Sequence, residues 1–575
     1  MDRKDVALVL EQIASFLELQ GGNPFRAKAF QAGAHTVASY PGHLGEALAS
    51  GALGELKGIG PATLDIISEV LETGQSRVLT DLRNQVPPGL VEMLKISGLG
   101  VTRIRQIHEH LGIESLDELE EAARDGRLAK LPRFGSKTAE NILKGIEFLQ
   151  HTSDFRLFHH AREEAEALAH VLGGMPGVRR AEIAGALRRR CEIIRELDFV
   201  LEVAGLGEEV ITRLGTAPGV TDFTPHGVEA ATLKFTSGTI AHVALAPPDQ
   251  FGFCLVTVTG NAMHVEELSE VAKSRGLEWT DHDLRREGAV VAAATEEDLF
   301  AELAMQFIPP ELREGRGEVA AAIAHELPEL VRERDVQGFL HCHTNYSDGK
   351  STVREWADMC FSHDYSYVGI TDHSLAAAYA GGLNVDGINE QHAEIDATNR
   401  ELPEFRVLKG VEADILPDGT LDYPAEVKAR FDFIIGSVHS RFAMTEAEMT
   451  NRILRAMDDP HMTILGHPTG RLLLSRDPYP LDMEAIFEKA VETGVAVEIN
   501  ADPQRLDLDW RLVRAATNSG VTISIGADAH STAGISNMDI GLGIARKGWL
   551  TSHNLLNAEP VDHFLERARR RRSRE

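Results

Sequence analysis

The sequence has few of the residues that mark secreted or membrane proteins. Its 4 cysteines (Cys191, Cys254, Cys342 and Cys360) have no paired spacing, which excludes a disulfide framework and predicts reduced thiols. No apolar run is long enough to span a bilayer, and the N-terminus mixes charges into an amphipathic helix, unlike a signal peptide. We therefore expect a cytoplasmic protein with no membrane partner. A monomer is the working expectation, since the sequence carries no signal of assembly.

Positive charge is also scarce. Lys and Arg number 58 against 88 Asp and Glu, a formal net charge of -30. This charge opposes nucleic-acid binding at long range but does not exclude it, because local donors can still hold a phosphate and bound metals would neutralise carboxylates. With 575 residues, 43% of them hydrophobic and 25% charged, the chain has the composition of a globular protein of two or three domains.

A glycine turn followed by an amphipathic helix occurs three times in the N-terminal part. The copies are LKGIGPATLDIISEVLETG, ISGLGVTRIRQIHEHLGI and LPRFGSKTAENILKGI, which begin at Leu56, Ile96 and Leu131. The pattern predicts helix-hairpin-helix units that bind a DNA backbone through N–H groups without reading its sequence, although plain helix caps are the alternative. The third copy has Arg133 where the others have glycine. The predicted DNA-contacting residues are Gly58, Ile59, Gly60, Gly98, Leu99, Gly100, Gly135 and Lys137.

Beyond about Phe158 strands and helices alternate. VRRAEIAG and ELDFVLEVAG are predicted to be neighbouring strands, with TSGTIAHVALAPP as a third. The prolines and charges of Ile308–Glu333 are typical of a linker. From Gly338 onward the short apolar strands YVGIT, FIIGSV, MTILG, VAVEI and VTISIGA alternate with helices, which predicts a parallel, barrel-like α/β domain.

Nearly every strand of that last domain ends in residues that bind metals. A single histidine there would more often be a core residue, but six such strand ends argue against that explanation. Catalytic groups of α/β barrels lie at these ends. Mixed imidazole and carboxylate ligands suit Mn²⁺, Zn²⁺ or Fe²⁺, and their number predicts two or three ions. The candidate ligands are His341, His343, Asp348, His373, Glu412, His439, His467, Asp528 and His530.

Adjacent divalent metals are suited to phosphoester hydrolysis, since they activate water and stabilise the charge of a phosphate. His439 is the ligand that we also expect to be catalytic. Arg471, four residues after His467, is a candidate phosphate contact, with a surface salt bridge as the equal alternative.

The motifs HCHTNYSDG, ITDHS, GVEADI, GSVHS, GHPTGR and GADAH resemble the PHP phosphoesterase family. The resemblance implies a distorted (βα)₇-type barrel. It also implies three metal positions, held by His341, His343, Glu412 and Asp528, by Glu412, His439 and His467, and by Asp348, His373 and His530. The family's Asp-Leu-His opening is Phe-Leu-His here, with the histidine retained.

The order of the segments, together with NPFRAKAF, VTGNAMH and LPDGTLDYP, resembles bacterial family X DNA polymerases over essentially the whole chain. The resemblance implies DNA as partner, with gaps, nicks or 3′ ends, and a deoxynucleoside triphosphate. It divides the chain into a helical lyase-like domain with helix-hairpin-helix (1–90), a helix-hairpin-helix fingers-like region (91–150), an α/β palm and thumb (151–315), a linker (316–335) and the PHP domain (336–575). Lysines are sparse in the first domain, so we assign it no lyase activity.

The expected palm departs from that family at its carboxylates. The family has Gly-Ser before two arginines, an Asp-x-Asp strand and a third aspartate, which hold two Mg²⁺ ions. Here Ala186 replaces the serine, Glu196 precedes Asp198, and His242 stands in the place of the third aspartate. These changes predict an impaired palm in which Mn²⁺ supports any remaining activity better than Mg²⁺. The nucleotide-binding residues implied are Gly185, Arg188, Thr259, Gly260 and Asn261.

The leading hypothesis is a DNA-repair enzyme, of the base-excision type, whose PHP domain is a 3′-5′ exonuclease or 3′-end phosphodiesterase acting on gapped or nicked DNA. The alternatives are a bifunctional polymerase and exonuclease that still fills gaps, a DNA-end-binding scaffold, and a small-molecule phosphatase. The three helix-hairpin-helix copies argue against the last, because a metabolite does not need them.

Overall fold

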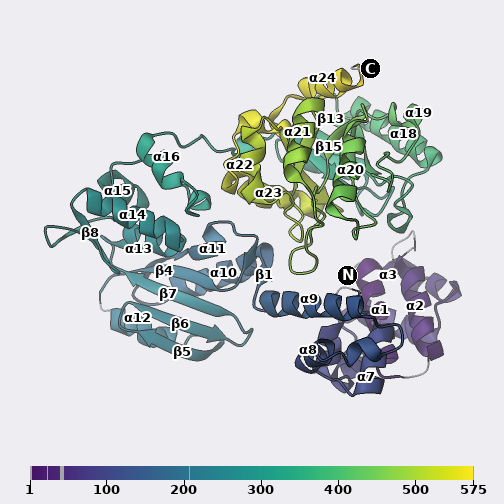
Figure 1. Ribbon diagram of the computed structural model, residues 1–575, viewed down its shortest axis with the longest axis horizontal. Coiled ribbons are helices and arrows are strands. Elements are labelled where there is room, and N and C mark those ends of the chain that lie inside the picture. The colour runs from purple at the N-terminus through teal and green to yellow at the C-terminus, as the bar shows by residue number, and fades with distance from the viewer. Residues whose placement is uncertain are drawn as a thin grey trace. The chain divides into compact units, whose positions relative to one another are not determined.

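The computed structural model describes residues 3–21, 24–38, 40, 44–96, 98–205 and 207–573. It contains two compact units, Met1–Asp154 and Phe155–Glu575, each described by itself below (Figure 1). The division lies close to the boundary expected at residue 150, and the finer boundaries stay predictions. In the described residues no helix is long and apolar enough to cross a membrane.

The first unit is helical, as predicted. Its helices enclose one continuous apolar core to which Leu10, Ile67, Ile107 and Ile142 contribute. Helices α4, α7 and α9 each begin directly after the glycine turn of one repeat copy. The helices of this unit are α1 (Arg3–Leu19), α2 (Pro24–Ala38), α3 (Leu44–Ala49), α4 (Pro61–Thr73), α5 (Arg77–Gln85), α6 (Pro88–Met93), α7 (Val101–Leu111), α8 (Leu116–Arg124) and α9 (Ser136–Thr152).

The second unit begins with a five-stranded sheet of order β2-β4-β7-β6-β5. Strands β2 and β4 are neighbours, as predicted, and the structure pairs them antiparallel, whereas β4 and β7 run parallel. The short strands β1 (Arg156–Leu157) and β3 (Ile193–Ile194) pair separately. The elements of the sheet layer are α10 (Phe158–Gly173), β2 (Val178–Ile183), α11 (Gly185–Arg188), β4 (Leu197–Val203), α12 (Gly207–Leu214), β5 (Val220–His226), β6 (Ala230–Phe235) and β7 (Ile240–Ala246).

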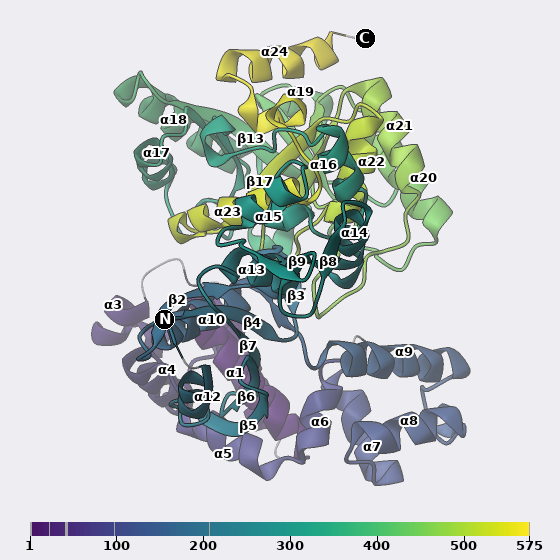
Figure 2. The ribbon, with the colours of Figure 1, turned by 90° about the vertical axis from the view of Figure 1, so that its left-hand side faces the viewer.

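A smaller group of elements follows the sheet, gathered together in Figure 2. Residues 316–335, predicted to be a linker, contain α16, and their side chains Val319, Ala322 and Leu330 are buried in the core of this group. The segment is therefore packed, because these apolar side chains complete the core although the segment is rich in charged residues. The elements are α13 (Phe251–Thr259), α14 (Ala262–Ser274), β8 (Leu277–Trp279), β9 (Leu284–Arg286), β10 (Ala289–Val291), α15 (Glu296–Glu302) and α16 (Glu318–Ala324).

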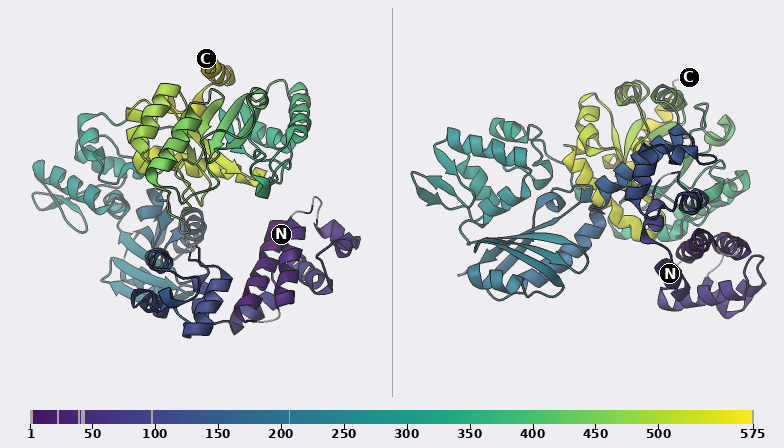
Figure 3. Two further views of the ribbon diagram at one scale, coloured as in Figure 1. Left: turned by 45° about the vertical axis from the view of Figure 1, so that its right-hand side comes forward. Right: turned by 60° about the horizontal axis from the view of Figure 1, so that its bottom comes forward.

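The remainder is a closed barrel of seven parallel strands, β11 to β17, with helices around it (Figure 3). Almost every strand residue is buried, which explains the continuous apolar runs in the sequence. The predicted barrel is confirmed. Its strands are β11 (Gly338–Cys342), β12 (Tyr367–Ile370), β13 (Arg406–Asp414), β14 (Phe433–Ser437), β15 (Met462–Leu465), β16 (Ala496–Asn500) and β17 (Ile523–Ala529). Its helices are α17 (Val353–Ser362), α18 (Val385–Glu401), α19 (Ala425–Lys428), α20 (Glu446–Met457), α21 (Met483–Thr493), α22 (Trp510–Asn518), α23 (Asn537–Lys547) and α24 (Val561–Arg572).

The sheet layer and the barrel pack against each other within this unit. Glu192, which is 6% exposed, accepts hydrogen bonds from Trp510 Nε1 at 3.1 Å and from Arg511 Nη1 at 3.1 Å. Lys547, which is 1% exposed, donates to the carbonyl oxygen of Arg189 at 2.9 Å and pairs with Glu314. Buried charges of the two parts are thus neutralised by each other.

Candidate metal centre and DNA-contacting elements

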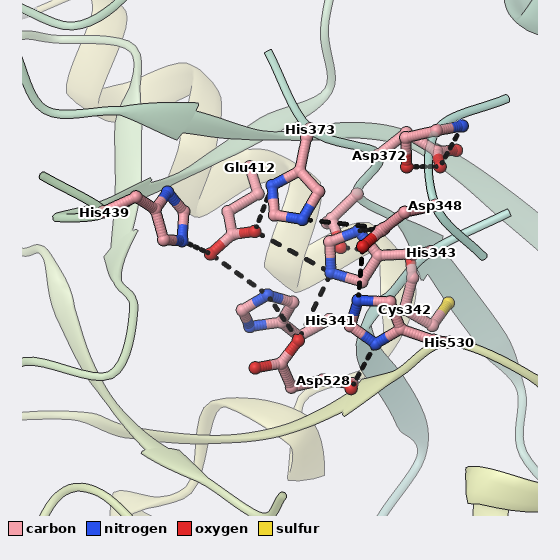
Figure 4. A network of polar contacts seen from close by, with 12 residues as sticks. His341, Cys342, His343, Asp348, Asp372, His373, Glu412, His439, Asp528 and His530 are labelled. Atoms are coloured by element: carbon pink, nitrogen blue, oxygen red, sulfur yellow. Dashed lines mark hydrogen bonds and ion pairs between the residues drawn. The ribbon is translucent and has the colours of Figure 1, made fainter. Parts of the chain in front are cut away.

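The predicted metal ligands converge at the carboxyl ends of the barrel strands (Figure 4). Parallel strands bring their carboxyl ends to one mouth, so residues far apart in sequence meet there. The ligands come from six strand ends: His341, His343 and Asp348 from β11, His373 from β12, Glu412 from β13, His439 from β14, His467 from β15, and Asp528 and His530 from β17.

Glu412 lies at the centre of this set. Its Oε1 is 3.0 Å from Nε2 of His467, 3.2 Å from Nε2 of His439 and 3.4 Å from Nε2 of His341. Its Oε2 is 3.0 Å from Nδ1 of His373. Burial alone would raise the pKa of Glu412, but the surrounding imidazoles, His439 first, hold it well below its ordinary value. Glu412 is therefore charged, and its carboxylate lies among imidazoles from four strand ends.

Three overlapping groups have ligand atoms within 4.8 Å of one another, close enough to hold an ion each. The groups are His341, His343 and Asp528; His343, Asp348, His373 and His530; and His373, Glu412 and His439. In the sets that the family resemblance implies, Glu412 is the shared residue. In the groups found here, His343 and His373 are each shared between two groups. His467 contacts Glu412 but belongs to none of the three groups found among the described residues.

The protonatable atoms at this mouth fit divalent cations. Several imidazole nitrogens are fully buried and have no hydrogen-bond partner in the described part of the chain: His341 Nε2, His343 Nδ1 and Nε2, and His467 Nδ1. A buried polar atom without a partner is costly, so such a cluster needs a ligand to satisfy it. Imidazole nitrogens and carboxylate oxygens are the donors that divalent metals of the first transition row accept.

Local backbone geometry aims three of these side chains. His341, His467 and Asp528 have φ angles of 61°, 24° and 46°, in the left-handed region that non-glycine residues rarely adopt. At His341 the register of β11 against both neighbouring strands is shifted, which marks a bulge. The prediction assumed straight strands with alternating side chains, and it did not include these distortions. Such backbone distortions cost conformational energy and are typical of functional sites.

The sequence reasoning missed the residues that hold the ligands. Glu498 on β16 accepts a hydrogen bond from Nδ1 of His341 at 2.6 Å and another from the backbone N–H of His467 at 2.7 Å. Asp414 on β13 accepts from Nδ1 of His439 at 2.5 Å. Such partners fix the tautomer and the orientation of a metal-binding imidazole. The sequence could have indicated both residues, since Asp414 follows Glu412 by two residues and Glu498 is the one charged residue in an apolar strand.

The pKa values of His343 and His439 are shifted in opposite directions. Burial lowers the pKa of His343 to about 3, so its ring is neutral and ready to bind a cation. Burial also opposes the charge on His439, but Glu412 and the hydrogen bond with Asp414 raise its pKa to about 10.

The guanidinium of Arg471, expected to contact phosphate, is hydrogen-bonded to the protein itself. Its Nε donates to the carbonyl oxygen of Arg505 at 2.9 Å, its Nη1 donates to Asp509 at 2.7 Å, and its Nη2 donates to the carbonyl of Leu506. All three nitrogens are thus engaged by the protein, which favours a structural role in holding the loop after β16. Arg505 on that loop instead lies at the metal centre, with Nε 3.3 Å from Oδ2 of Asp528.

The residues of the predicted palm also meet. Asp198 on β4 and His242 on β7 are directly opposite in the parallel register, and Nε2 of His242 lies 3.0 Å from Oε2 of Glu196. Burial raises the pKa of Asp198 to about 6. A Cβ on Gly185, whose φ is 60°, would come within 1.8 Å of Asp198 Oδ2, so this position requires glycine. His242 thus lies between Glu196 and the strand of Asp198, and its place as the third palm position stays a prediction.

The expected nucleotide-binding residues lie in one network. Arg188 donates to both carboxylate oxygens of Glu296 at 2.7 Å and to the hydroxyl of Thr259 at 3.1 Å. Gly260 follows as the C-cap of α13, and Asn261 caps α14 by accepting from a backbone N–H. In this state the guanidinium of Arg188 is occupied by a carboxylate.

The three helix-hairpin-helix copies have the same turn. The N–H of the apolar turn residue donates to the carbonyl three residues earlier, from Ile59 at 3.2 Å, from Leu99 at 3.0 Å and from Phe134 at 3.1 Å. Gly60, Gly100 and Gly135 are the N-caps of α4, α7 and α9, and Lys137 is exposed in the first turn of α9.

The weakest copy in sequence keeps this geometry. Gly58 and Gly98 have φ angles of 96° and 78°, and Arg133 in the third copy takes the same left-handed conformation with φ of 68°. A non-glycine residue there carries strain. Contacts of these turns with DNA stay a prediction.

The chain matches four known domain families. These are the helix-hairpin-helix domain at residues 1–76, the SAM-like helix-hairpin-helix tandem at 90–147, the DNA polymerase beta thumb at 254–314 and the PHP domain at 340–502. The helix-hairpin-helix and thumb domains indicate DNA binding, and the PHP domain with its clusters is compatible with divalent metals.

Similar proteins agree with these matches. The chain is 35% identical over 575 residues to the DNA polymerase/3′-5′ exonuclease PolX of Bacillus subtilis (strain 168), covering 99% of this chain and 100% of that protein. It is 25% identical over 244 residues to a probable phosphatase of Thermoanaerobacter sp. (strain X514), covering 40% of this chain and 95% of that one. A probable phosphatase of Clostridium acetobutylicum is 34% identical over 149 residues, which cover 24% of this chain and 59% of its own length.

Proposed function

The chain belongs to the PolX family of DNA polymerases, and on that premise we propose that it is a DNA-repair enzyme that shortens or cleans 3′ ends of gapped or nicked DNA. The PHP barrel is the nuclease, acting as a metal-dependent 3′-5′ exonuclease or 3′-end phosphodiesterase. The observation that carries the proposal is the convergence of histidines and carboxylates around Glu412 at the barrel mouth.

The residues at the mouth have separate tasks in this proposal. Two or three divalent ions there, with Mn²⁺ or Zn²⁺ preferred and Fe²⁺ as a further candidate, would supply the acidity that activates water and the charge that stabilises the phosphate. Glu412, whose two oxygens lie beside His373 and His439, would be among the ligands that hold these ions. Asp414 holds His439 with Nε2 turned to Glu412.

The second candidate function is gap filling by the palm, which we propose is impaired. His242 is paired with Glu196 opposite Asp198, so one of the three anionic positions is an imidazole. An octahedral Mg²⁺ site tolerates such a change poorly, whereas Mn²⁺ accepts nitrogen. Arg188 would have to release Glu296 before its guanidinium could contact a deoxynucleoside triphosphate.

One experiment separates these functions. The purified full chain is given 5′-labelled gapped DNA with Mn²⁺, with and without nucleotides, beside His439→Ala and Asp198→Ala variants. Shortening that His439→Ala abolishes supports the nuclease. Extension that Asp198→Ala abolishes would show an active palm. Phosphate released from small esters while DNA stays intact would refute the DNA nuclease in favour of a small-molecule phosphatase, and DNA binding without any turnover would favour a scaffold.

A further inference from the structure

An exposed aromatic side chain stands beside the metal centre without a structural task. Tyr379 lies in the loop between β12 and α18 and is 73% exposed. Its ring centre is 6.2 Å from that of His373 and 6.4 Å from that of His439. Leu375 on the same loop and Val385 at the start of α18 are also exposed. Large apolar side chains left open next to a catalytic centre are available to a flat, partly apolar ligand.

The guanidinium of Arg505 lies beside another candidate ligand, Asp528, at the same metal centre. Arg505 contacts Oδ2 of Asp528 through Nε, and within the described part of the chain neither of its terminal nitrogens donates a hydrogen bond. Its backbone is fixed, because its carbonyl oxygen accepts from Nε of Arg471. Because Nε contacts Asp528, the two terminal nitrogens of the planar guanidinium remain as donors for phosphate oxygens.

The ligand that needs both features at once is a nucleotide. We propose that Tyr379 and Arg505 form the subsite for the terminal nucleotide: Arg505 donates to its phosphate and Tyr379 stacks on its base. The inference rests on the proposed nuclease function and adds its substrate recognition. Since every base has a π-face, stacking tolerates all four bases but requires an unpaired one. The subsite therefore selects frayed or single-stranded ends over paired ends.

Stacking on Tyr379 can be measured without turnover. Gapped DNA with 2-aminopurine as its 3′-terminal base is titrated with the full chain in EDTA, and the emission of the base is followed. We expect quenching with wild-type protein, with Tyr379→Phe and with Val491→Ala, a control at an exposed apolar side chain on α21. Tyr379→Ala should lose most of the quenching while the DNA still binds. Equal quenching with Tyr379→Ala would overturn the stacking role.

Cleavage of two matched ends tests the whole subsite. One DNA ends in an ordinary nucleotide and the other in a tetrahydrofuran residue that has no base. Tyr379→Ala should slow removal of the nucleotide by about tenfold or more and leave the baseless end unchanged. Arg505→Gln should slow both by about a hundredfold, as loss of a phosphate donor does, with metal content as in the wild type.

The outcomes separate the two claims. If wild-type protein removes both ends and Tyr379→Ala slows them equally, the base-stacking inference fails while the nuclease stands. If Arg505→Gln with full metal content cleaves normally, the phosphate contact is refuted. If wild-type protein removes neither end, the proposed nuclease function itself fails.

Discussion

Replacing Glu498 by glutamine should weaken metal binding without unfolding the barrel. The carboxylate is fully buried, and it accepts from Nδ1 of His341 at 2.6 Å through one oxygen and from the backbone N–H of His467 at 2.7 Å through the other. Glutamine has nearly the same shape but only one accepting oxygen, so its NH₂ group would face one of these donors. One ligand would then lose its hold, and the negative charge that favours a cation would disappear.

The size of the effect follows from the supporting role of Glu498. Loss of such a partner of a metal-binding histidine typically lowers metal affinity about 10- to 100-fold, or roughly 1.4–2.7 kcal/mol. Mn²⁺ affinity would be measured by competition with a chelator for wild type, Glu498→Gln and Glu488→Gln, a control at an exposed carboxylate on α21. A folded Glu498→Gln protein, judged by circular dichroism, that binds Mn²⁺ as tightly as the control would refute the argument.

Three further predictions concern other parts of the chain. Arg133→Gly should stabilise the N-terminal unit by about 1 kcal/mol, and Gly98→Ala should destabilise it by a similar amount, because both positions have a left-handed backbone; unchanged melting temperatures in calorimetry would contradict this. His439, whose pKa Glu412 and Asp414 raise to about 10 against its burial, is protonated at pH 7 in metal-free protein, so metal binding should release its proton. That release appears as a buffer-dependent heat in titration calorimetry and should shrink in His439→Asn; a heat that is the same in all buffers would exclude it. Because burial raises the pKa of Asp198 to about 6, its charge destabilises the metal-free protein above that pH, so Asp198→Asn should raise the melting temperature at pH 8 and have little effect at pH 4; equal shifts at both pH values would count against this.

The metal centre was predictable because parallel strands collect their ends at one place. The position of a ligand such as Asp528 can therefore be predicted from the strand to which it belongs. The supporting residues were harder to predict, since Glu498 in the run VAVEI resembles an ordinary core strand with one polar residue.

Other features depend on packing that local patterns do not reveal. Arg471 and Arg505 each follow a strand of the barrel in the sequence. Only the structure shows that backbone carbonyls accept hydrogen bonds from Arg471. Arg133 broke the glycine pattern, yet its backbone adopts the conformation that glycine takes in the other copies. The segment 316–335 looked like a linker because of its charged residues, although its side chains Val319, Ala322 and Leu330 are buried.

The buried charges between the sheet layer and the barrel limit how this chain can vary. Glu192 and Lys547 each lie in one part and find their partners in the other, so neither part can be excised without stranding a charge in an apolar surface. A palm without catalytic activity would still be needed, because its contacts neutralise buried charges of the barrel. Mutations there would be selected for folding, and the catalytic positions could drift while the loop around Glu192 could not.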